Sequence, residues 1–567
     1  AIGANRTGIL LGEGAAMEGN LYLQSGSSIL VEGNASAGVL LLSPLNGDLR
    51  AEGSISVTGT GAQGITAAGR VDGDVTIGGS VSAKGENAIA VRLDDGATGA
   101  VALNGSVVAT GFAFSSTSNY VAPSLVTEDT TPLDERLDAD ELLSGGPAFV
   151  IGGSLGQGLL INGAAPDPDL SDDEDEDETK DTIEDFNENR SAGSITSYGS
   201  APALLISADW DGEATEDLVL GEVLETVRDT LDDDEDDDTD EVLAQFAYTY
   251  GLINRGGISG AGTNVGFDGT GILIEGSAST GHSVIIVGGI ENIGSITASA
   301  YEANATALRL GTNVSTPALV NQGTIQALIS TETVANAIAL DIAETASLPV
   351  LENSGTLLAR STGNSGEVTT VRDLSGTLGT ITNTGTISAV YQNDGVSLTT
   401  RSDGTAFDLR SNATGVTLHQ HEREATYDAN GDDEINSLDT LNPSITGNIF
   451  FGSGDDLLLI EGGTVTGDID FGAGSDTLTA SGADLSGNLS FGGEGALVRL
   501  LNGSTLTGDI AFENSGTSDF LISGGATYAG RIYNTGSDLS FTLDASRAQL
   551  SEGTALTLSN LAIGNGA

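Results

Sequence analysis

Internal repetition is the feature that most constrains what this chain can fold into. Near the N-terminus four units begin alike, and their spacings are 28, 26 and 26 residues. Each unit alternates apolar and polar side chains and is interrupted by glycine, which is the pattern of short β-strands joined by tight turns. The units are GNLYLQSGSSILVEG, GDLRAEGSISVTG, GDVTIGGSVSAKG and GAVALNGSVVATG, starting at Gly19, Gly47, Gly73 and Gly99.

A second repeat places asparagine before a glycine turn in INRGGIS, ENIGSITA, VNQGTIQA, ENSGTLLA and TNTGTISA. Two interpretations are open. Equivalent asparagines in stacked coils form a hydrogen-bonded ladder, or each is a solvent-facing turn residue. The five recurrences, spaced 38, 29, 32 and 30 residues apart, favour the ladder. They lie at Asn254, Asn292, Asn321, Asn353 and Asn383.

A third repeat near the C-terminus is shorter, with spacings of 20, 20, 21 and 22 residues between the glycines at 447, 467, 487, 508 and 530. Repeats of this length built from strands and glycine turns predict an all-β fold, a parallel β-solenoid (β-helix) with acidic loop insertions. One stretch, DLVLGEVLETVRDTL from Asp217, suggests a short helix instead.

The repeats and the acidic runs predict five segments. They are N-terminal solenoid coils at 1–120, a solenoid interrupted by acidic insertions (125–145, 167–190 and 209–241) at 121–250, a central solenoid at 251–418, an insertion with a calcium-type loop at 419–445, and a C-terminal solenoid at 446–567.

The net charge of −62 is concentrated in the three acidic insertions, which hold 37 of the 81 acidic residues. A chain this acidic repels nucleic acid and anionic membranes. The absence of cysteine excludes disulfides, thiolate metal sites and cysteine nucleophiles. Apolar runs are too short for a membrane-spanning helix, and no signal-like stretch follows Ala1, so we expect a processed or partial product.

The NxGxI and TG[DN]IxFGxGxDxL repeats resemble the passenger regions of bacterial autotransporters (type V secretion). The resemblance covers most of residues 1–110 and 250–545. It implies a right-handed β-helix at the outer-membrane surface, and it fits the scarcity of cysteine. The family also carries a C-terminal translocator barrel. The chain stops at NLAIGNGA without one, so we expect the barrel to have been cleaved or to lie beyond Ala567.

The strongest local motif is DANGDDEINSLD, in which oxygen-bearing side chains recur at loop positions 1, 3, 5, 9 and 12. This spacing wraps one loop around a hard cation such as Ca²⁺, with position 7 offering its backbone carbonyl. The motif resembles the calcium loop of dockerin and EF-hand modules, but it has Asp433 where glycine is usual. The alternative is an acidic surface turn. The predicted ligands are Asp428, Asn430, Asp432, Glu434, Asn436 and Asp439.

The stretches FGSGDDLLL and FGAGSDTLT resemble the calcium nonapeptide of repeats-in-toxin proteins, in which case Asp456 and Asp476 would be Ca²⁺ ligands. Their period of about twenty residues, rather than nine, favours ordinary glycine-rich turns of a solenoid coil. The acidic insertions are also open to two interpretations: solvated tethers, or carboxylate clusters that become ordered around Ca²⁺. His419 and His421 alternate onto one strand face with Glu424 nearby, and we expect exposed polar residues rather than a metal pair.

No Ser-His-Asp set or other catalytic residues can be assembled at a convincing spacing. We therefore expect a non-enzymatic extracellular bacterial surface protein. It would be a calcium-stabilised rod that self-associates into a surface layer or filament or acts as an adhesin, with other copies, an outer-membrane barrel or surface glycans as partners. The alternative is a β-helical polysaccharide lyase or glycosidase, since such enzymes use clustered carboxylates.

Overall fold

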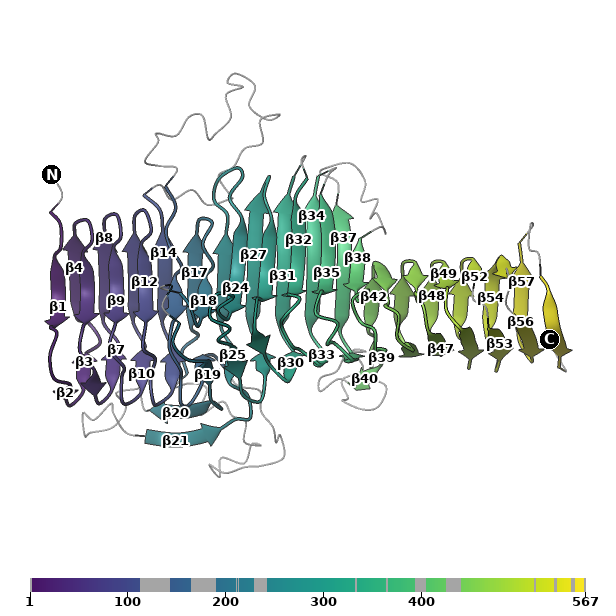
Figure 1. The fold of residues 1–567 in the computed structure, drawn as a ribbon, viewed down its shortest axis with the longest axis horizontal. Helices are drawn as coiled ribbons and strands as arrows, with labels where there is room; N and C mark the ends of the chain where they lie inside the picture. The colour runs from purple at the N-terminus through teal and green to yellow at the C-terminus, as the bar shows by residue number, and fades with distance from the viewer. Residues whose placement is uncertain are drawn as a thin grey trace, which may run out of the picture. The chain divides into compact units, whose positions relative to one another are not determined.

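The computed structural model describes residues 3–112, 143–164, 190–210, 212, 214–228, 242–331, 334–363, 366–392, 404–424, 440–513, 516–534, 538–551 and 556–564. The regular elements in these ranges are β-strands, nearly all paired in parallel. They form two compact units, Ala1–Pro317 and Ala318–Ala567. Each unit is a right-handed parallel β-solenoid, which confirms the predicted fold (Figure 1). The finer division into five segments stays a prediction.

Each coil of unit 1 contributes one strand to each of three sheets, which are numbered 1 to 3 here. Sheet 1 contains β3 (Leu21–Leu23), β7 (Leu49–Ala51), β10 (Val75–Ile77), β13 (Val101–Leu103), β16 (Leu159–Ile161), β22 (Leu252–Asn254) and β26 (Ile290–Asn292). Sheet 2 contains β4 (Ser28–Glu32), β8 (Ser54–Thr58), β11 (Ser80–Lys84), β14 (Ser106–Thr110), β17 (Ser194–Tyr198), β23 (Gly257–Ala261) and β27 (Ser295–Tyr301). Sheet 3 contains β1 (Thr7–Leu11), β5 (Ala37–Leu41), β9 (Gln63–Ala67), β12 (Ile89–Leu93), β15 (Phe149–Ile151), β18 (Leu204–Ser207), β24 (Gly269–Glu275) and β28 (Ala305–Leu310).

Short strands also pair at the corner of unit 1 between sheets 3 and 1. They are β2 (Met17–Glu18) with β6 (Leu45–Asn46), and β19 (Leu218–Leu220) with β25 (Val284–Ile286) and β29 (Val314–Ser315).

Unit 2 repeats the three-sheet arrangement. Sheet 1 contains β30 (Ala318–Asn321), β33 (Val350–Asn353), β36 (Thr380–Asn383), β39 (Thr417–His421), β44 (Leu457–Glu461), β47 (Ser475–Ser481), β50 (Gly495–Leu501), β53 (Thr517–Ser523), β56 (Asp538–Asp544) and β58 (Leu558–Ile563). Sheet 2 contains β31 (Thr324–Ser330), β34 (Thr356–Thr362), β37 (Thr386–Gln392), β42 (Ser444–Thr446), β45 (Thr464–Thr466), β48 (Asp484–Ser486), β51 (Thr505–Thr507), β54 (Thr527–Gly530) and β57 (Arg547–Leu550). Sheet 3 contains β32 (Asn336–Ile342), β35 (Glu367–Asp373), β38 (Thr405–Asp408), β43 (Asn448–Phe450), β46 (Ile469–Asp470), β49 (Leu489–Phe491), β52 (Ile510–Phe512) and β55 (Ile532–Asn534).

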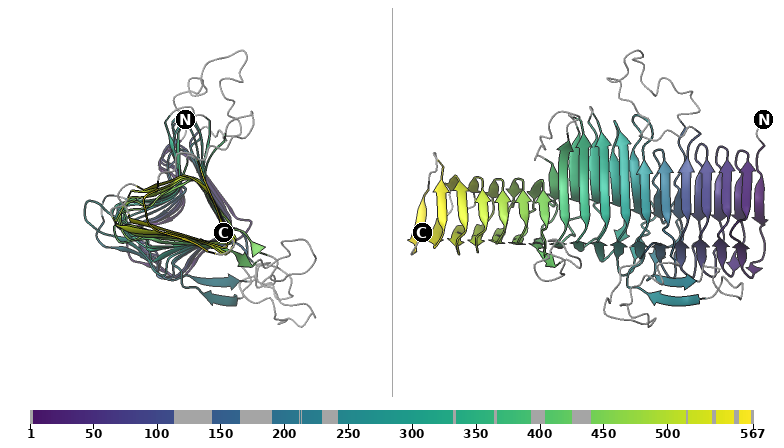
Figure 2. Two further views of the ribbon diagram at one scale, coloured as in Figure 1. Left: turned by 90° about the vertical axis from the view of Figure 1, so that its right-hand side faces the viewer. Right: turned by 180° about the vertical axis from the view of Figure 1, so that it is seen from behind.

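The core of each coil lies inside a three-sided cross-section (Figure 2, left). Alternate residues of each strand point inward, as the period of two predicts. In β8, for example, Ile55 and Val57 are buried. Because the coils stack in register, each inward residue lies over its equivalent in the next coil, as Ile55 does over Val81. In the C-terminal coils this produces a buried column of Phe451, Phe471, Phe491 and Phe512, whose neighbouring ring centroids are 5.2, 4.5 and 5.5 Å apart.

The repeated asparagines form the predicted ladder, and the solvent-turn interpretation is wrong. In unit 1 the Nδ2 of Asn254 donates to Oδ1 of Asn292 at 2.7 Å. In unit 2 Asn321, Asn353 and Asn383 continue in the same way at 2.7 and 2.9 Å, and the ladder ends on the side chain of Gln420. All six side chains are buried, so each amide satisfies the next in a place that water does not reach.

One stretch predicted to be helical is extended instead. Residues 218–220 form β19, and residues 224–228 form β20, which pairs antiparallel with β21 (Val242–Ala247). Leu218 and Leu220 are buried while Val219 between them is less so. The side chains therefore follow a period of two, and pairing with β25 outweighs the helical propensity of the sequence. Part of the range 209–241 thus belongs to the coil.

Glycine recurs at one corner of unit 1 because the backbones of successive coils approach each other closely there. A Cβ atom on Gly79 would lie 1.9 Å from the carbonyl oxygen of Gly53, and one on Gly105 would lie 1.9 Å from that of Gly79. A backbone oxygen held in a ladder cannot move aside as a flexible side chain can. Gly79 and Gly105, each in a GS dipeptide of the repeat, are therefore required by packing.

We predict that Gly79→Ala destabilises unit 1 by about 3 kcal/mol, because the added methyl group separates two coils. The measurement is the change in unfolding midpoint in denaturant. Gly12→Ala is the matched control, since no atom of a described residue lies within 4 Å of a Cβ built there. Its stability should change by less than about 0.5 kcal/mol. Equal effects of the two substitutions would contradict the packing explanation.

Candidate functional site

The predicted calcium loop, Asp428–Asp439, lies outside the described residues, so its six predicted ligands stay a prediction. The structure does describe the strands on either side. β40 (Arg423–Glu424) and β41 (Thr440–Leu441) pair antiparallel, with Glu424 opposite Thr440. The two ends of segment 425–439 are therefore held one strand spacing apart, which is compatible with a single loop that closes on itself.

The other two predicted ligands, Asp456 and Asp476, lie in neighbouring coils at the corner of unit 2 where β44 and β47 begin. Both are buried, with exposed fractions of 2% and 1%. The backbone N–H of Val416 donates to Oδ1 of Asp456 at 2.7 Å, and the N–H of Asp456 donates to Oδ1 of Asp476 at 3.0 Å. The Oδ2 atom of each carboxyl is buried and has no hydrogen-bond partner among the described residues.

Burial raises the pKa values of both the Asp456 and the Asp476 carboxyl groups. Burial disfavours the charged form and brings the pKa of Asp456 to about 6 and that of Asp476 to about 7. Either a proton or a bound cation would relieve this cost. Ca²⁺ takes six to eight oxygen ligands, and among the described residues no three His, Asp or Glu side chains lie together as a metal site. Backbone carbonyls or water would have to complete the shell of a cation bound here.

In two earlier coils of unit 2, a buried polar side chain at the turn between sheets 3 and 1 forms hydrogen bonds with the backbone of the turn. Asp373 is buried and accepts hydrogen bonds from the backbone N–H groups of Ser375, Gly376 and Leu378. Asn412 is buried and donates its Nδ2 to the carbonyl of Leu378 at 3.0 Å. Asp456 and Asp476 each receive only one such bond in the described structure, which leaves room for a proton or a ligand.

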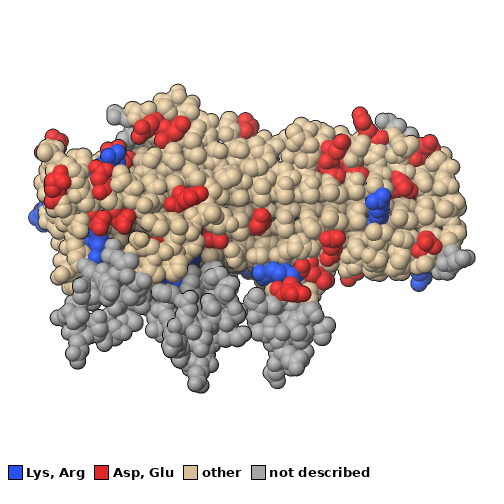
Figure 3. All heavy atoms as spheres, turned by 90° about the horizontal axis from the view of Figure 1, so that it is seen from below, with Lys and Arg blue, Asp and Glu red and all other residues tan. Residues whose placement is uncertain are grey.

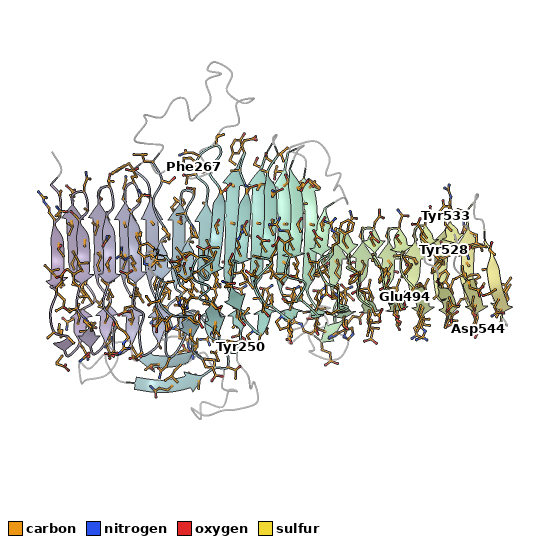
Figure 4. The ribbon with its side chains drawn as sticks, viewed as in Figure 1. Tyr250, Phe267, Glu494, Tyr528, Tyr533 and Asp544 are labelled. Carbon is orange, nitrogen blue, oxygen red and sulfur yellow. The ribbon has the colours of Figure 1, made fainter. Side chains whose placement is uncertain are left out.

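Sequence reasoning missed a buried ionic cluster beneath the β20–β21 hairpin of unit 1. Glu225 on β20 accepts from Nε of Arg190 at 2.8 Å, from Nη1 of Arg255 at 2.8 Å and from the Tyr248 hydroxyl at 2.8 Å. The three charged side chains are 1% exposed. The guanidinium of Arg255 also lies over the Tyr248 ring, 4.8 Å from its centroid. This network fastens the hairpin to the outer face of sheet 1. Figure 4 shows the hairpin, with Tyr250 labelled close to the end of β21.

The cluster favours an ionised Glu225. Burial alone would raise its pKa, but the charges and hydrogen bonds of Arg255 and Arg190 outweigh burial, and the pKa lies below its ordinary value. A cavity of about 60 Å³ adjoins the cluster, with Arg50, Asn104 and Asn162 in its lining. One signal was available in the sequence. Residue 255 is arginine where the other NxG repeats have Ile, Gln, Ser or Thr.

His419 and His421 lie close to each other and to one acidic neighbour. The Nε2 of His419 lies 2.8 Å from a carboxylate oxygen of Glu461 in the next coil, and the rings of His419 and His421 are 4.7 Å apart. These side chains are partly exposed on the outer face of sheet 1. Of the acidic insertions, 125–145 and 167–190 lie outside the described residues except at residues 143–145 and 190.

Comparisons of the chain with protein-family models, with characterised proteins and with solved structures find no match.

We predict that unit 2 is more stable at pH 5 than at pH 8 because of Asp456 and Asp476. Their folded pKa values lie above the ordinary value near 3.8. The stabilisation they contribute is therefore fully present below pH 4 and is lost as the pH rises through 6 and 7. We expect the free energy of unfolding of unit 2 to fall by on the order of 3 kcal/mol between pH 5 and pH 8. The measurement is the denaturation midpoint of unit 2 at both pH values.

Asp476→Asn should remove much of this pH dependence, because the amide stays neutral. Asp519→Asn is the matched control, since Asp519 is exposed on β53 and should leave the pH dependence unchanged. If Ca²⁺ restores stability at pH 8 in the wild type but not in Asp476→Asn, the two carboxyls hold a cation. A pH profile that is identical in all three proteins would contradict the assignment.

A second prediction concerns the hairpin cluster. Glu225→Gln leaves two buried guanidinium groups without their counter-charge, which typically costs about 3–5 kcal/mol. We expect the amides of β20 and β21 to exchange hydrogen much faster while the coils of unit 1 stay protected. Glu222→Gln, at an exposed position three residues away, should leave the exchange unchanged. Equal protection of the hairpin in both variants would show that the cluster does not fasten it.

Proposed function

We propose that this protein is a non-catalytic bacterial surface component in which a rigid β-solenoid displays acidic loops for calcium-dependent contacts, with other copies or as an adhesin. One observation carries the proposal: the segments that interrupt the repeats leave each unit at corners between its sheets and do not disturb the register of the coils. Ser106 of β14 pairs with Ser194 of β17 although residues 113–142 and 165–189 lie between them in the sequence.

The same arrangement is found in unit 2. Thr386 of β37 pairs with Ser444 of β42, although residues 393–403 and 425–439 intervene. In a solenoid each coil contacts only its neighbours, so an insertion at a corner costs little beyond the entropy of closing a loop. A scaffold of this kind carries long loops without changing its core, and such loops are where binding residues gather. The acidic composition of the insertions supports Ca²⁺ as their ligand.

The enzyme alternative has less support. A glycosidase or lyase needs a carboxyl group that reaches its substrate and exchanges a proton with it. Glu225, a buried carboxylate that lines the cavity of about 60 Å³ in unit 1, is enclosed by two arginines and a tyrosine, and its pKa is lowered. This is the environment of a structural ion pair.

The test is to replace segments 165–189 and 425–439 by short Gly-Ser linkers, singly and together. We expect the unfolding midpoint of each unit to be unchanged within error, because the register on either side does not depend on the loops. Calcium-dependent self-association, measured by sedimentation velocity with Ca²⁺ and with a chelator, should be lost. Loss of folding would overturn the scaffold proposal, and turnover of an anionic polysaccharide by the intact protein would overturn the non-catalytic one.

A further inference from the structure

His419 and His421 point outward from one strand of unit 2, on either side of a residue that is held in place. Gln420 between them is buried, and its side chain ends the asparagine ladder and donates to the carbonyl of Gly462 at 3.2 Å. The backbone of β39 is paired on both sides, with β36 and with β44. The two histidines therefore extend from a rigid strand, and their ring centroids are 4.7 Å apart.

The hydrogen bonds of the two rings determine which nitrogen of each ring is free. Nε2 of His419 lies 2.8 Å from Oε2 of Glu461, and Nδ1 of His421 lies 2.8 Å from the backbone carbonyl oxygen of Glu422. An ionised carboxylate and a carbonyl only accept hydrogen bonds, so in the neutral rings these two nitrogens are the donors. The lone pairs are on Nδ1 of His419 and Nε2 of His421, and neither nitrogen has a hydrogen-bond partner among the described residues.

Histidines that bind metal ions are held in the same way. Their second ring nitrogen donates to a carboxylate or a backbone carbonyl, which fixes the ring and makes the free nitrogen a better ligand. Two imidazole nitrogens about 2.0–2.1 Å from one ion, with roughly 90–110° between the two bonds, place the ring centroids about 4.5–5.2 Å apart. The observed separation of 4.7 Å lies within this range. The torsion that turns a histidine ring is soft, so the two free nitrogens can turn toward a shared ion.

We infer that His419 and His421 together bind one divalent transition-metal ion, such as Zn²⁺ or Cu²⁺, with water in its remaining coordination positions. Two protein ligands are enough for such a site, so it does not require a group of three His, Asp or Glu side chains, and the described residues contain none. Glu461 and Glu422 act as positioning residues through the rings. The inference goes beyond the proposed function, because imidazole selects a transition metal whereas Ca²⁺ takes oxygen ligands.

The charge around the two histidines favours a cation. The protein has 81 acidic and 19 basic residues, and acidic side chains outnumber basic ones on the side seen in Figure 3. Beside the pair, Glu461 and Glu422 are acidic, while the charges of Arg423 and Glu424 on β40 cancel. Negative surroundings raise the local concentration of cations. The site also adjoins the paired strands β40 and β41, so a bound ion would lie at the base of segment 425–439.

The small number of histidines allows a direct test. The chain has three, His282, His419 and His421, so the imidazole spectrum of the nitrogen-15-labelled full chain contains three rings. His282 is the internal control, because a carboxylate oxygen of Asp217 lies 3.4 Å from its ring but no second histidine is near it in the sequence. Zn²⁺ is added at pH 7, with millimolar Ca²⁺ present to occupy sites made of oxygen ligands alone. Equimolar Zn²⁺ should shift the ring nitrogens of His419 and His421 together and leave His282 unchanged. Equal shifts of all three rings, or no shift, would overturn the site.

Substitutions give an independent measurement. His419→Gln and His421→Gln each remove one ligand from a partly exposed position, and each should weaken Zn²⁺ binding at least about tenfold in a calorimetric titration. Glu461→Ala should change the nitrogen shifts of the His419 ring, because its tautomer is no longer fixed, and should weaken binding about tenfold. His282→Gln is the matched control and should bind Zn²⁺ as the wild type does, with circular dichroism confirming that all four variants fold. The same affinity in every variant would show that Zn²⁺ binds to surface carboxylates and would refute the site.

Discussion

The structure depends on the parallel backbone ladder, which places each coil directly over the last. Because the ladder repeats at about 4.8 Å, a side chain that points inward meets its own equivalent in the next coil. The residue at each position of the repeat must therefore pack against an equivalent residue in the next coil. Phenylalanine rings satisfy this by stacking, asparagines by donating an amide to the next carbonyl, and glycines by leaving space for a backbone oxygen. The same residue types therefore recur at equivalent positions of successive repeats in the sequence.

This requirement explains what could be read from the sequence. Alternation of apolar and polar residues within a repeat predicts the strands, and recurrence of the same residue between repeats predicts that the coils stack. The asparagine ladder was therefore predicted from the five recurring asparagines, such as Asn353 and Asn383, and the fold from the three sets of repeats. The β20–β21 hairpin did not follow, because it occurs once. The stretch from Leu218 to Arg228 forms β19 and the first strand of the hairpin, and its apolar residues fit both a helical and a strand spacing. The strand conformation is decided by the pairing of β19 with β25 and by packing against the coil.

The candidate site was harder to predict for a related reason. Glycine and aspartate together suggest an exposed turn, and Asp456 and Asp476 are at a turn. The sequence does not show that the next coil covers them. Burial turns two expected surface ligands into carboxyls with raised pKa values, each with one oxygen that has no partner in the part of the chain that the structure describes. Arg255 was visible as an exception among the NxG repeats, but its partners Glu225 and Arg190 come from segments that the repeat pattern does not align.

Stacking also constrains where charge can be placed. An outer row of unit 2 runs from Asn448 through Asp468, Asn488 and Asp509 to Arg531, and in it each Oδ1 accepts the N–H of the next residue in the row. Two carboxylates at about 4.8 Å repel by roughly 1–3 kcal/mol at a protein surface, and doubling the distance halves this before screening. Asparagine supplies the same acceptor without the charge. Alternation of Asn and Asp thus preserves the hydrogen bonds of the row while keeping its carboxylates two coils apart. A solenoid can carry only a limited density of aspartate on its faces, and this chain places nearly half of its acid in segments that lie outside the repeats.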